Sequence, residues 1–220
     1  MQNIVLVGSS GHAKVVIDIV ERQGLYRIVG LIDAFRAPGE TTLAYPVLSG
    51  ESDLTIIADE LDLKGVIVAI GDNYVRAKVA ANVAEICPQL PLVSAVHPEA
   101  SIGKGTTIGA GTVVMAGAVI NSACEIGRGC IVNTRASLDH DCVMEDYSSL
   151  APGVTTGGNC RIGNHAAVSI GAVLRHGVVI GEHSVVGAGS IVLKDVDAFS
   201  VTYGSPAKKI RDRLSGDKYL

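Results

Sequence analysis

Histidine is the side chain best suited to proton transfer near neutral pH, because its unperturbed pKa is about 6.5. The chain has six histidines, and one of them, His140, lies between two acids in the segment Leu138-Asp139-His140-Asp141-Cys142. A carboxylate beside an imidazole ring orients the ring and raises its basicity. The sequence therefore offers His140 as a candidate general base, and the alternative is a solvated surface side chain without a role in chemistry.

A glycine-containing turn near the N-terminus suits a phosphate group. Residues 3–7 are predicted to form a buried strand, and Gly8-Ser9-Ser10-Gly11-His12 leads from it into a predicted helix that ends near Gln23. A helix N-terminus offers free backbone N–H groups to an anion. The turn is a degenerate dinucleotide-binding fingerprint, and Asp33 stands about where an acidic ribose ligand would. The alternative is a tight strand-to-helix turn with Asp33 as a strand-end cap.

Two more strands are predicted near residues 27–32 and 65–70, and a further helix follows the second of these and runs to about Ile86. The alternation of strands and helices predicts a small parallel sheet flanked by helices. Asn73 and Arg76 are expected to line the same crevice as the glycine turn. The alternative is that Asp72 or Asn73 is a plain helix N-cap.

A six-residue period runs through the second half of the chain. Every sixth residue from Ile102 to Val192 is Ile, Leu or Val in fourteen of sixteen cases, with Met144 and the polar Thr156 as exceptions. Every sixth residue from Thr106 is small. This period fits neither a helix nor an alternating strand, but it is typical of short strands coiled into a parallel β-helix. Three hexapeptides make one triangular coil, so residues eighteen apart are expected to stack.

The coil frame assigns positions to the cysteines and histidines. His140 is expected to stack between Ser122 and Gly158, and the glycine stacked over His140 is expected to leave an open notch on the outer surface. Tyr147, His165 and His183 are expected to form another column, a stacked ladder at a subunit contact. Four cysteines fall in the small interior slot, and small core residues are favoured there over metal ligands or nucleophiles: Cys124, Cys130, Cys142 and Cys160.

Composition narrows the class of protein. Of the 220 residues, 48% are hydrophobic and 18% charged, which favours a substantial core. The net charge is −4 and the Lys and Arg residues are scattered, which argues against a nucleic-acid surface. No apolar run approaches the ~20 residues of a membrane span, and the N-terminus lacks signal-peptide features, so a cytoplasmic protein is expected.

Pro91 and His97-Pro98 mark the expected hinge into the repeat, and the repeat ends after Val192. The segment Gly204-Ser205-Pro206-Ala207-Lys208 is expected to lead into a short polar helix. Such a helix would cover the open end of the β-helix, where strand edges are otherwise exposed.

Four motifs together resemble one family. They are Gly8-Ser9-Ser10-Gly11-His12-Ala13-Lys14-Val15-Val16, Ala69-Ile70-Gly71-Asp72-Asn73, Leu138-Asp139-His140-Asp141-Cys142 and Gly204-Ser205-Pro206-Ala207-Lys208. Over nearly its whole length the chain is similar to the sialic-acid and bacillosamine type of sugar acyltransferases, which includes UDP-4-amino-sugar and GDP-perosamine N-acetyltransferases. The resemblance implies an α/β Rossmann-like nucleotide-sugar-binding domain over 1–92, a left-handed parallel β-helix of hexapeptide repeats over 93–200, and a C-terminal capping helix within 201–220.

The resemblance also implies a function. It implies a homotrimeric, acetyl-CoA-dependent N-acetyltransferase without a metal, with active sites between subunits. The acceptor would be a nucleotide-linked amino sugar, such as a 4-amino-4,6-dideoxy sugar for surface glycan (lipopolysaccharide O-antigen) synthesis, and His140 would be the base with Asp141 assisting. By position, the resemblance implies that the substrate is held by Ser10, Gly11, His12 and Asp33, and that the acetyl-CoA groove is lined by Ser149, Gly158, Ile170 and Ala188. The further residues expected to bind substrate are Gly8, Gly71, Asn73 and Arg76, and Lys208 is also expected to bind acetyl-CoA. Ser149 departs from relatives that have a histidine there.

Three alternatives stay open at this point. O-acetylation of a hydroxyl would use the same base and donor. A γ-type carbonic anhydrase is also a hexapeptide trimer, but its zinc histidines are typically about five residues apart, whereas His176 and His183 are seven apart. A β-helix that binds a nucleotide sugar without catalysis is the third. The sequence does not identify the nucleotide.

Overall fold

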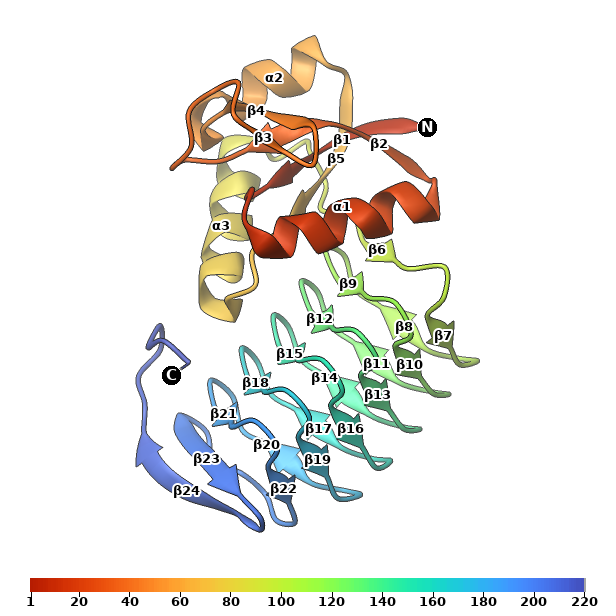
Figure 1. Ribbon diagram of the computed structural model, residues 1–220, viewed down its shortest axis with the longest axis vertical. Helices are drawn as coiled ribbons and strands as arrows, with labels where there is room; N and C mark the ends of the chain where they lie inside the picture. The colour runs from red at the N-terminus through yellow and green to blue at the C-terminus, as the bar shows by residue number, and fades with distance from the viewer. Residues whose placement is uncertain (220) are drawn as a thin grey trace. The chain divides into compact units, whose positions relative to one another are not determined.

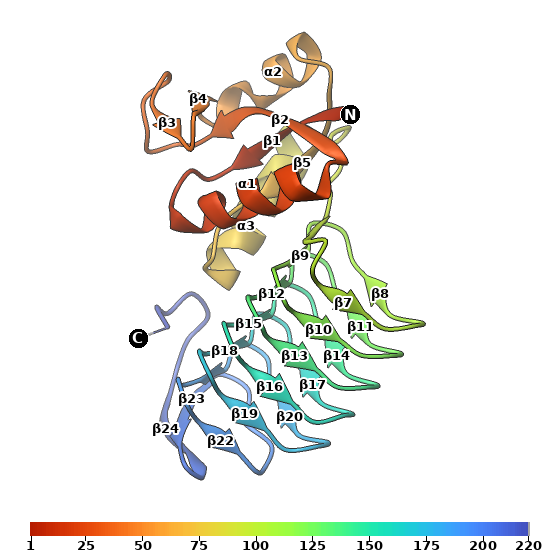
Figure 2. The ribbon, with the colours of Figure 1, turned by 45° about the vertical axis from the view of Figure 1, so that its right-hand side comes forward.

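The computed structural model describes residues 1–219 and divides the chain into two compact units, one covering Met1–Pro98 and the other beginning at Glu99 (Figures 1 and 2). The first unit mixes strands with helices, and the second consists of short strands. Among residues 1–219, no helix combines the length and apolar character needed to cross a bilayer.

The first unit is an α/β sheet with helices. Its sheet has the strand order β3-β4-β2-β1-β5, in which β1 pairs in parallel with β2 and β5, β2 pairs in parallel with β4, and β3 pairs antiparallel with β4. The elements are β1 (Gln2–Val7), α1 (Gly11–Gln23), β2 (Tyr26–Ile32), β3 (Thr41–Thr42), β4 (Tyr45–Ser49), the 3₁₀ turn η1 (Glu51–Asp53), α2 (Leu54–Glu60), β5 (Leu63–Val68) and α3 (Asn73–Ile86).

The three strands and two helices expected from the pattern are confirmed in this unit, and the central strand shows why. All four residues from Ile4 to Val7 are at most 1% exposed, because a parallel sheet with helices on its faces buries its strands on both sides. The helix α1 ends at Gly24, whose left-handed backbone (φ 68°) is the usual C-terminal stop of a helix. The β3–β4 hairpin and α2 were not predicted.

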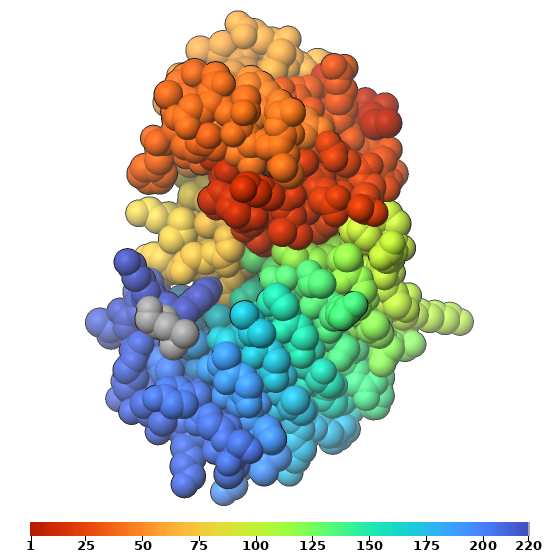
Figure 3. Space-filling view, viewed as in Figure 1, coloured from red at the N-terminus to blue at the C-terminus, as the bar shows by residue number. Residues whose placement is uncertain are grey.

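The second unit is a parallel β-helix. Strands that follow each other at an interval of eighteen residues pair in register, as Ile120 does with Leu138, so the predicted eighteen-residue coil is confirmed. The strands form three faces: face 1 (β7, β10, β13, β16, β19, β22), face 2 (β8, β11, β14, β17, β20) and face 3 (β9, β12, β15, β18, β21, with β23 and β24). Successive coils are stacked in both ribbon views, and their surface is continuous in the space-filling view (Figure 3).

Each strand from β7 to β22 is two residues long, and short turns join them. The short strand β6 (Ala95–Val96) precedes the coils. The coil strands are β7 (Ser101–Ile102), β8 (Thr107–Ile108), β9 (Val113–Val114), β10 (Val119–Ile120), β11 (Glu125–Ile126), β12 (Ile131–Val132), β13 (Ser137–Leu138), β14 (Val143–Met144), β15 (Ser149–Leu150), β16 (Thr155–Thr156), β17 (Arg161–Ile162), β18 (Ala167–Val168), β19 (Val173–Leu174), β20 (Val179–Ile180), β21 (Val185–Val186) and β22 (Ile191–Val192).

The two slots of the repeat are interior, as predicted. The aliphatic slot is buried from Val114 to Val192, while Ile102 in the first coil is 38% exposed. The cysteines of the small slot are all free and buried, and burial raises the pKa of the Cys124 thiol, which keeps it protonated and unreactive. A glycine after the aliphatic leaves room for the next coil: a Cβ on Gly163 would lie 2.6 Å from the backbone nitrogen of Glu182.

A column of rings stands on one corner of the coils, between faces 2 and 3. Tyr147 stacks on His165 with ring centroids 5.7 Å apart, His165 on His183 at 4.5 Å, and His183 on Phe199 at 4.9 Å. All four residues have left-handed backbone, with φ between 52° and 58°. The ladder expected from the sequence is confirmed and is one ring longer than expected, and its place at a subunit contact stays a prediction.

The C-terminal segment corrects one expectation. The short polar helix predicted after Ala207 is wrong: β23 (Ser200–Gly204) pairs in parallel with β21, and β24 (Ala207–Asp212) pairs antiparallel with β23. The reason is that the last coil leaves the backbone groups of β21 open, and pairing with that edge outweighs the helix preference of a polar segment.

We predict that Leu150→Ala destabilises the second unit by ~2–5 kcal/mol, because Leu150 is fully buried and registers with Val132 and Val168 in the coils on either side. Denaturant unfolding at one fixed protein concentration measures the change. The matched variant Thr155→Ala alters an exposed outward residue and should change stability by less than ~0.5 kcal/mol. Equal effects of the two variants would contradict the assignment of the aliphatic slot to the core.

Candidate active site

His140 lies on the corner between face 1 and face 2, in the turn that joins β13 to β14. Its Nδ1 is 2.7 Å from Oδ2 of Asp141, and both side chains are about half exposed, at 51% and 55%. Asp141 has left-handed backbone (φ 58°), the conformation of this corner position throughout the coils. The contact between the imidazole and the carboxylate is thus made by adjacent residues of one turn.

This contact defines what the ring can do. With Nδ1–H donated to the Asp141 carboxylate, the free lone pair is on Nε2, which is then the atom that can take a proton. The hydrogen bond to Asp141 raises the pKa of His140, and the charges of Asp139 and Asp141 act in the same direction. An imidazole with a raised pKa in an open position is suited to general base catalysis.

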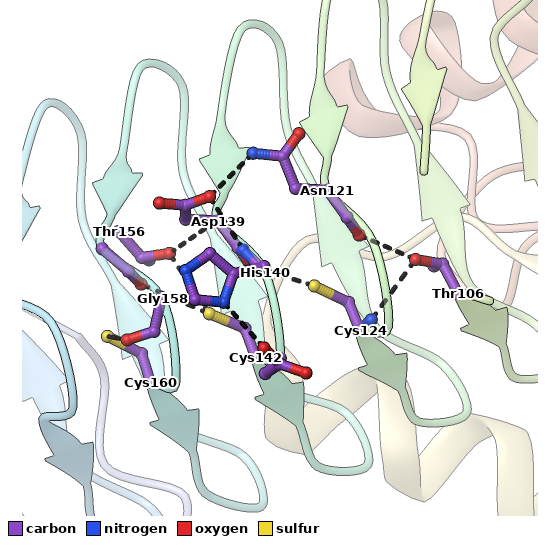
Figure 4. Close-up of polar contacts among 11 residues, drawn as sticks. Thr106, Asn121, Cys124, Asp139, His140, Cys142, Thr156, Gly158 and Cys160 are labelled. Atoms are coloured by element: carbon purple, nitrogen blue, oxygen red, sulfur yellow. Dashed lines mark hydrogen bonds and ion pairs between the residues drawn. The ribbon is translucent and has the colours of Figure 1, made fainter. Parts of the chain in front are cut away.

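A second set of contacts holds the turn itself (Figure 4). Oδ1 of Asp139 accepts hydrogen bonds from the His140 backbone at 2.8 Å and from Nδ2 of Asn121, one coil below, at 2.9 Å. These bonds lower the pKa of Asp139, so that it stays charged. The backbone nitrogen of Asp139 in turn donates to Oγ1 of Thr156, one coil above, at 3.3 Å.

Gly158 lies directly beside the imidazole, as Figure 4 shows. A Cβ at this position would come within 2.7 Å of both Cε1 and Nε2 of His140. The space predicted above the histidine therefore exists, and the imidazole ring itself fills it. Any larger residue at 158 would push the ring away. The ring of His176, two coils above His140, is the next on this corner, with centroids 6.4 Å apart.

The first unit has a cleft of about 250 Å³ at the carboxyl ends of its strands. Gly8, Ser10 and Asp33 line it, three of the residues expected to bind substrate. Asp33 is fixed by two bonds: Oδ2 accepts from Oγ of Ser9 at 2.5 Å and Oδ1 from the backbone of Phe35 at 2.9 Å. The first turn of α1 contains no acidic side chain, and the Ser10 side chain does not cap the helix. The backbone N–H groups at the start of α1 are therefore available to an anion.

The other expected substrate residues lie elsewhere. Asn73 and Arg76 are buried, with Nη2 of Arg76 donating to Oδ1 of Asn73 at 2.7 Å and Nη1 donating to the carbonyl of Gly71 at 3.0 Å. Asp72 is the side chain that caps α3, by accepting from the backbone of Val75. These contacts build the turn after β5. The side chains of Asp72, Asn73 and Arg76 do not line the cleft.

His12 and Gly11 belong to the first turn of α1. Burial, assisted by the positive charge of Arg76, lowers the pKa of His12 to about 4, so the imidazole is neutral at physiological pH. Its Nε2 is buried and makes no hydrogen bond within residues 1–219. Gly11 is exposed at the start of the helix.

The residues expected to bind acetyl-CoA divide between corners of the β-helix. Gly158 is on the corner of His140, between faces 1 and 2. Ser149 points outward from face 3, and Ile170 and Ala188 stand one coil apart on the corner between faces 3 and 1, both exposed. Lys208 is exposed on β24. One chain therefore does not bring these five residues to a single place.

Three residues near these sites were not found from the sequence. Thr156 left a signal, because it is the one polar residue in the aliphatic slot, and the hydrogen bond from Asp139 explains the exception. Asn121 is eighteen residues before Asp139, and the coil period would have found it. Glu51, which lines the cleft of the first unit, left no signal, because it follows a strand that was not predicted.

Comparison with known proteins identifies both units. Residues 3–83 match the PglD N-terminal domain, and residues 159–194 match the bacterial transferase hexapeptide family (six repeats). A chloramphenicol acetyltransferase of Klebsiella aerogenes is 32% identical over 72 residues, or 33% of this chain and 34% of that protein. The GDP-perosamine N-acetyltransferase of Escherichia coli O157:H7 is 29% identical over 150 residues, 66% of each chain. The chain thus spans about a third of the first relative and about two thirds of the second.

Solved structures match over almost the full length. Perosamine N-acetyltransferase from Caulobacter crescentus, in complex with CoA and GDP-perosamine and with a histidine replaced by asparagine, is 34% identical, with a TM-score of 0.90 over 96% of this chain and 98% of that one. The acetyltransferase domain of PglB from Neisseria gonorrhoeae FA1090, in complex with acetyl coenzyme A, is 30% identical, with a TM-score of 0.84 over 95% and 99%. This chain, with its PglD-type N-terminal unit and its hexapeptide β-helix, belongs to the family of sugar N-acetyltransferases that includes perosamine N-acetyltransferase.

Proposed function

We propose that this protein transfers the acetyl group of acetyl-CoA to the amino group of a nucleotide-linked amino sugar, with a 4-amino-4,6-dideoxy sugar as the class of acceptor. The observation that supports this most strongly is the His140–Asp141 pair on an open corner of the β-helix. The relatives add support, because perosamine N-acetyltransferase binds CoA and GDP-perosamine, and it was also studied with a histidine replaced by alanine.

The proposed chemistry uses His140 as the general base. The amine nitrogen attacks the thioester carbonyl, and Nε2 takes the proton that the nitrogen loses as the C–N bond forms. The C–S bond then breaks, and CoA leaves as the thiol after receiving a proton. Backbone N–H groups near the base would stabilise the oxyanion of the tetrahedral intermediate. Asp141 keeps the Nδ1–H tautomer and holds the ring, and removal of such a base typically costs ~10²–10⁴ in rate.

The cleft of the first unit is proposed to hold the nucleotide. Its lining supports this assignment, because Gly8 and Ser10 precede a helix with free N–H groups and Asp33 offers a fixed carboxylate to ribose hydroxyls. Gly11 and His12 continue the same helix turn and complete the proposed phosphate site. Gly71, Asn73 and Arg76 are proposed to support the site by holding the turn after β5 rather than by touching the ligand.

We further propose a homotrimer of left-handed coils with active sites between subunits. The support is the placement of the acetyl-CoA residues: Ile170 and Ala188 stand on a different corner from His140, so a second copy must supply one of the two corners. Ser149 and Lys208 are proposed to contact the cofactor from face 3. The C-terminal hairpin β23–β24 is proposed to cap the coils, and a cytoplasmic location stays the expectation from the sequence.

Replacement of the base tests this function. We predict that His140→Ala lowers turnover by ~10²–10⁴ while the folded state is retained, because the side chain is half exposed and supports no core contact. The assay follows the thiol released from acetyl-CoA with UDP-, GDP- and dTDP-linked amino sugars, and mass spectrometry of the product locates the acetyl group.

His176→Ala is the matched control, since it removes a neighbouring exposed imidazole that has no hydrogen-bonded carboxylate within residues 1–219, and it should retain turnover within about threefold. Unchanged turnover in His140→Ala would exclude this base. Acetylation of hydroxyl acceptors alone would replace N-transfer by O-transfer.

The carboxylate beside the base sets the pH dependence. In the folded protein Asp141 raises the pKa of His140, so Asp141→Asn should lower that pKa toward its ordinary value. The acidic limb of the pH–rate profile should therefore move to lower pH, and the rate at the plateau should fall because a weaker base removes the proton. NMR titration of the His140 ring measures the pKa directly, and an unmoved pKa would contradict the role of the hydrogen bond.

The buried hydroxyl above the turn should affect activity rather than stability. Thr156→Val has nearly the same shape and restores the aliphatic slot, but it removes the partner of the Asp139 N–H; because these effects oppose each other, unfolding stability should change by less than about 1 kcal/mol. Loss of the bond to the Asp139 backbone should lower kcat by ~2–10-fold with little change in KM, because only the position of His140 is altered. A loss of stability in parallel with activity would show that the hydroxyl is merely structural.

A further inference from the structure

The cleft of the first unit has an apolar lining from two parts of the chain, here called its apolar walls. Val75 and Val79 come from α3, while Ile32 and Ala34 come from the end of β2 and the turn after it. Phe35 also lines the cleft and is 98% exposed, so its ring is free to cover a ligand. A flat aromatic ring, such as a nucleobase, fits between apolar walls of this kind.

One charged group belongs to the same cleft. Glu51 begins η1, directly after β4 and Gly50, and β4 is the parallel neighbour of β2, the strand that Asp33 follows. Its Oε2 accepts a hydrogen bond from Nδ2 of Asn82, on the helix that supplies Val75 and Val79. Within residues 1–219, no other side chain bonds to this carboxylate. Its remaining lone pairs are therefore available to a ligand.

The two carboxylates of the cleft differ in what holds them. Asp33 is fixed by Ser9 and by the Phe35 backbone at the strand end, where a ribose ligand is expected. Glu51 stands one strand further along the sheet, at the end of β4. A ribose on Asp33 therefore shares the cleft with Glu51 and the apolar walls.

We propose that this cleft selects guanine, with the Glu51 carboxylate accepting hydrogen bonds from N1–H and the 2-amino group of the base. This inference rests on the proposed function, because it assigns the base of the nucleotide that the same site would hold. Guanine presents two adjacent donors on one edge, which match the two oxygens of a carboxylate. Asn82 orients the carboxylate from behind.

Other bases lack this pair of donors. Uracil and thymine have a single N–H between two carbonyl oxygens, and a carboxylate facing that edge would meet one donor and at least one oxygen that repels it. Adenine and cytosine each place a ring nitrogen acceptor beside the amino group. A site built around an acceptor pair discriminates against such ligands, because they replace a donor by an acceptor that repels the carboxylate.

Binding of nucleoside diphosphates to the full-length protein tests the proposal. Isothermal titration calorimetry with GDP, IDP, UDP and dTDP compares the four bases at one salt concentration. IDP is the matched probe for GDP, because its base, hypoxanthine, keeps the N1–H of guanine and lacks only the 2-amino group. We expect the affinity for GDP to be at least about tenfold higher than the affinity for IDP. The affinities for UDP and dTDP should be lower than that for IDP.

Glu51→Gln tests the residue. The amide replaces one acceptor by a donor, so GDP affinity should fall by about tenfold or more, and the difference between GDP and IDP should disappear. Glu60→Gln is the control, since Glu60 is exposed on α2 and outside the cleft, and it should bind all four nucleotides as the unaltered protein does. The ratio of GDP to IDP affinity is independent of any loss of folded protein.

The outcomes separate the two proposals. Tighter binding of UDP or dTDP than GDP, or equal binding of GDP and IDP, would overturn the choice of guanine and leave the nucleotide-sugar function standing. A GDP preference that survives in Glu51→Gln would overturn the role of this carboxylate. Failure of all four nucleotides to bind would overturn both the guanine proposal and the nucleotide site of the proposed function.

Discussion

The structure of the second unit depends on one constraint, the backbone hydrogen bonding of each strand to the strand eighteen residues later. Val119 donates to Ala136 at 2.9 Å, and the same step recurs along the coils, as from Ser137 to Val154 at 2.8 Å. With that register fixed, every corner residue has a defined neighbour above and below. Two-residue strands are far too short to be stable alone, so stacking supplies their stability.

The site on the β-helix is a consequence of this register. Asn121, Asp139 and Thr156 come from three successive coils, yet they form one connected set of hydrogen bonds around the turn of the proposed base, His140. The glycine beside the imidazole is likewise eighteen residues from it, because a side chain there would meet the ring. The repeat that stabilises the core thus also positions the side chains at the corners of the coils. The interior pattern imposes no residue type at these corners, so functional side chains can stand there.

The features of the second unit that could be predicted from the sequence are those that depend on the coil register alone. The period determined the coils, the buried cysteines and the ring column, since each depends only on register. The β3–β4 hairpin was missed because its turn is Leu43-Ala44, with φ of 47° and 68°, where the usual glycine or asparagine is absent. The strand β24 was missed because pairing at an open edge, rather than local preference, decides its conformation. A ligand role is expected for Asn73 and Arg76 from the sequence because both are polar and follow a strand. The structure buries both side chains, and this burial depends on tertiary packing that the sequence pattern does not show.

Two histidines among the predicted site residues show how the surroundings of an imidazole determine its chemistry. Burial lowers the pKa of His12 to about 4, whereas the adjacent carboxylate raises that of the exposed His140. A base must gain a proton in the reaction, and the gain is favoured where the resulting cation is stabilised, as at His140, and opposed where it is desolvated. The two flanking acids already favour His140 in the sequence, and the 2.7 Å contact between its Nδ1 and Asp141 supports that choice over the buried His12.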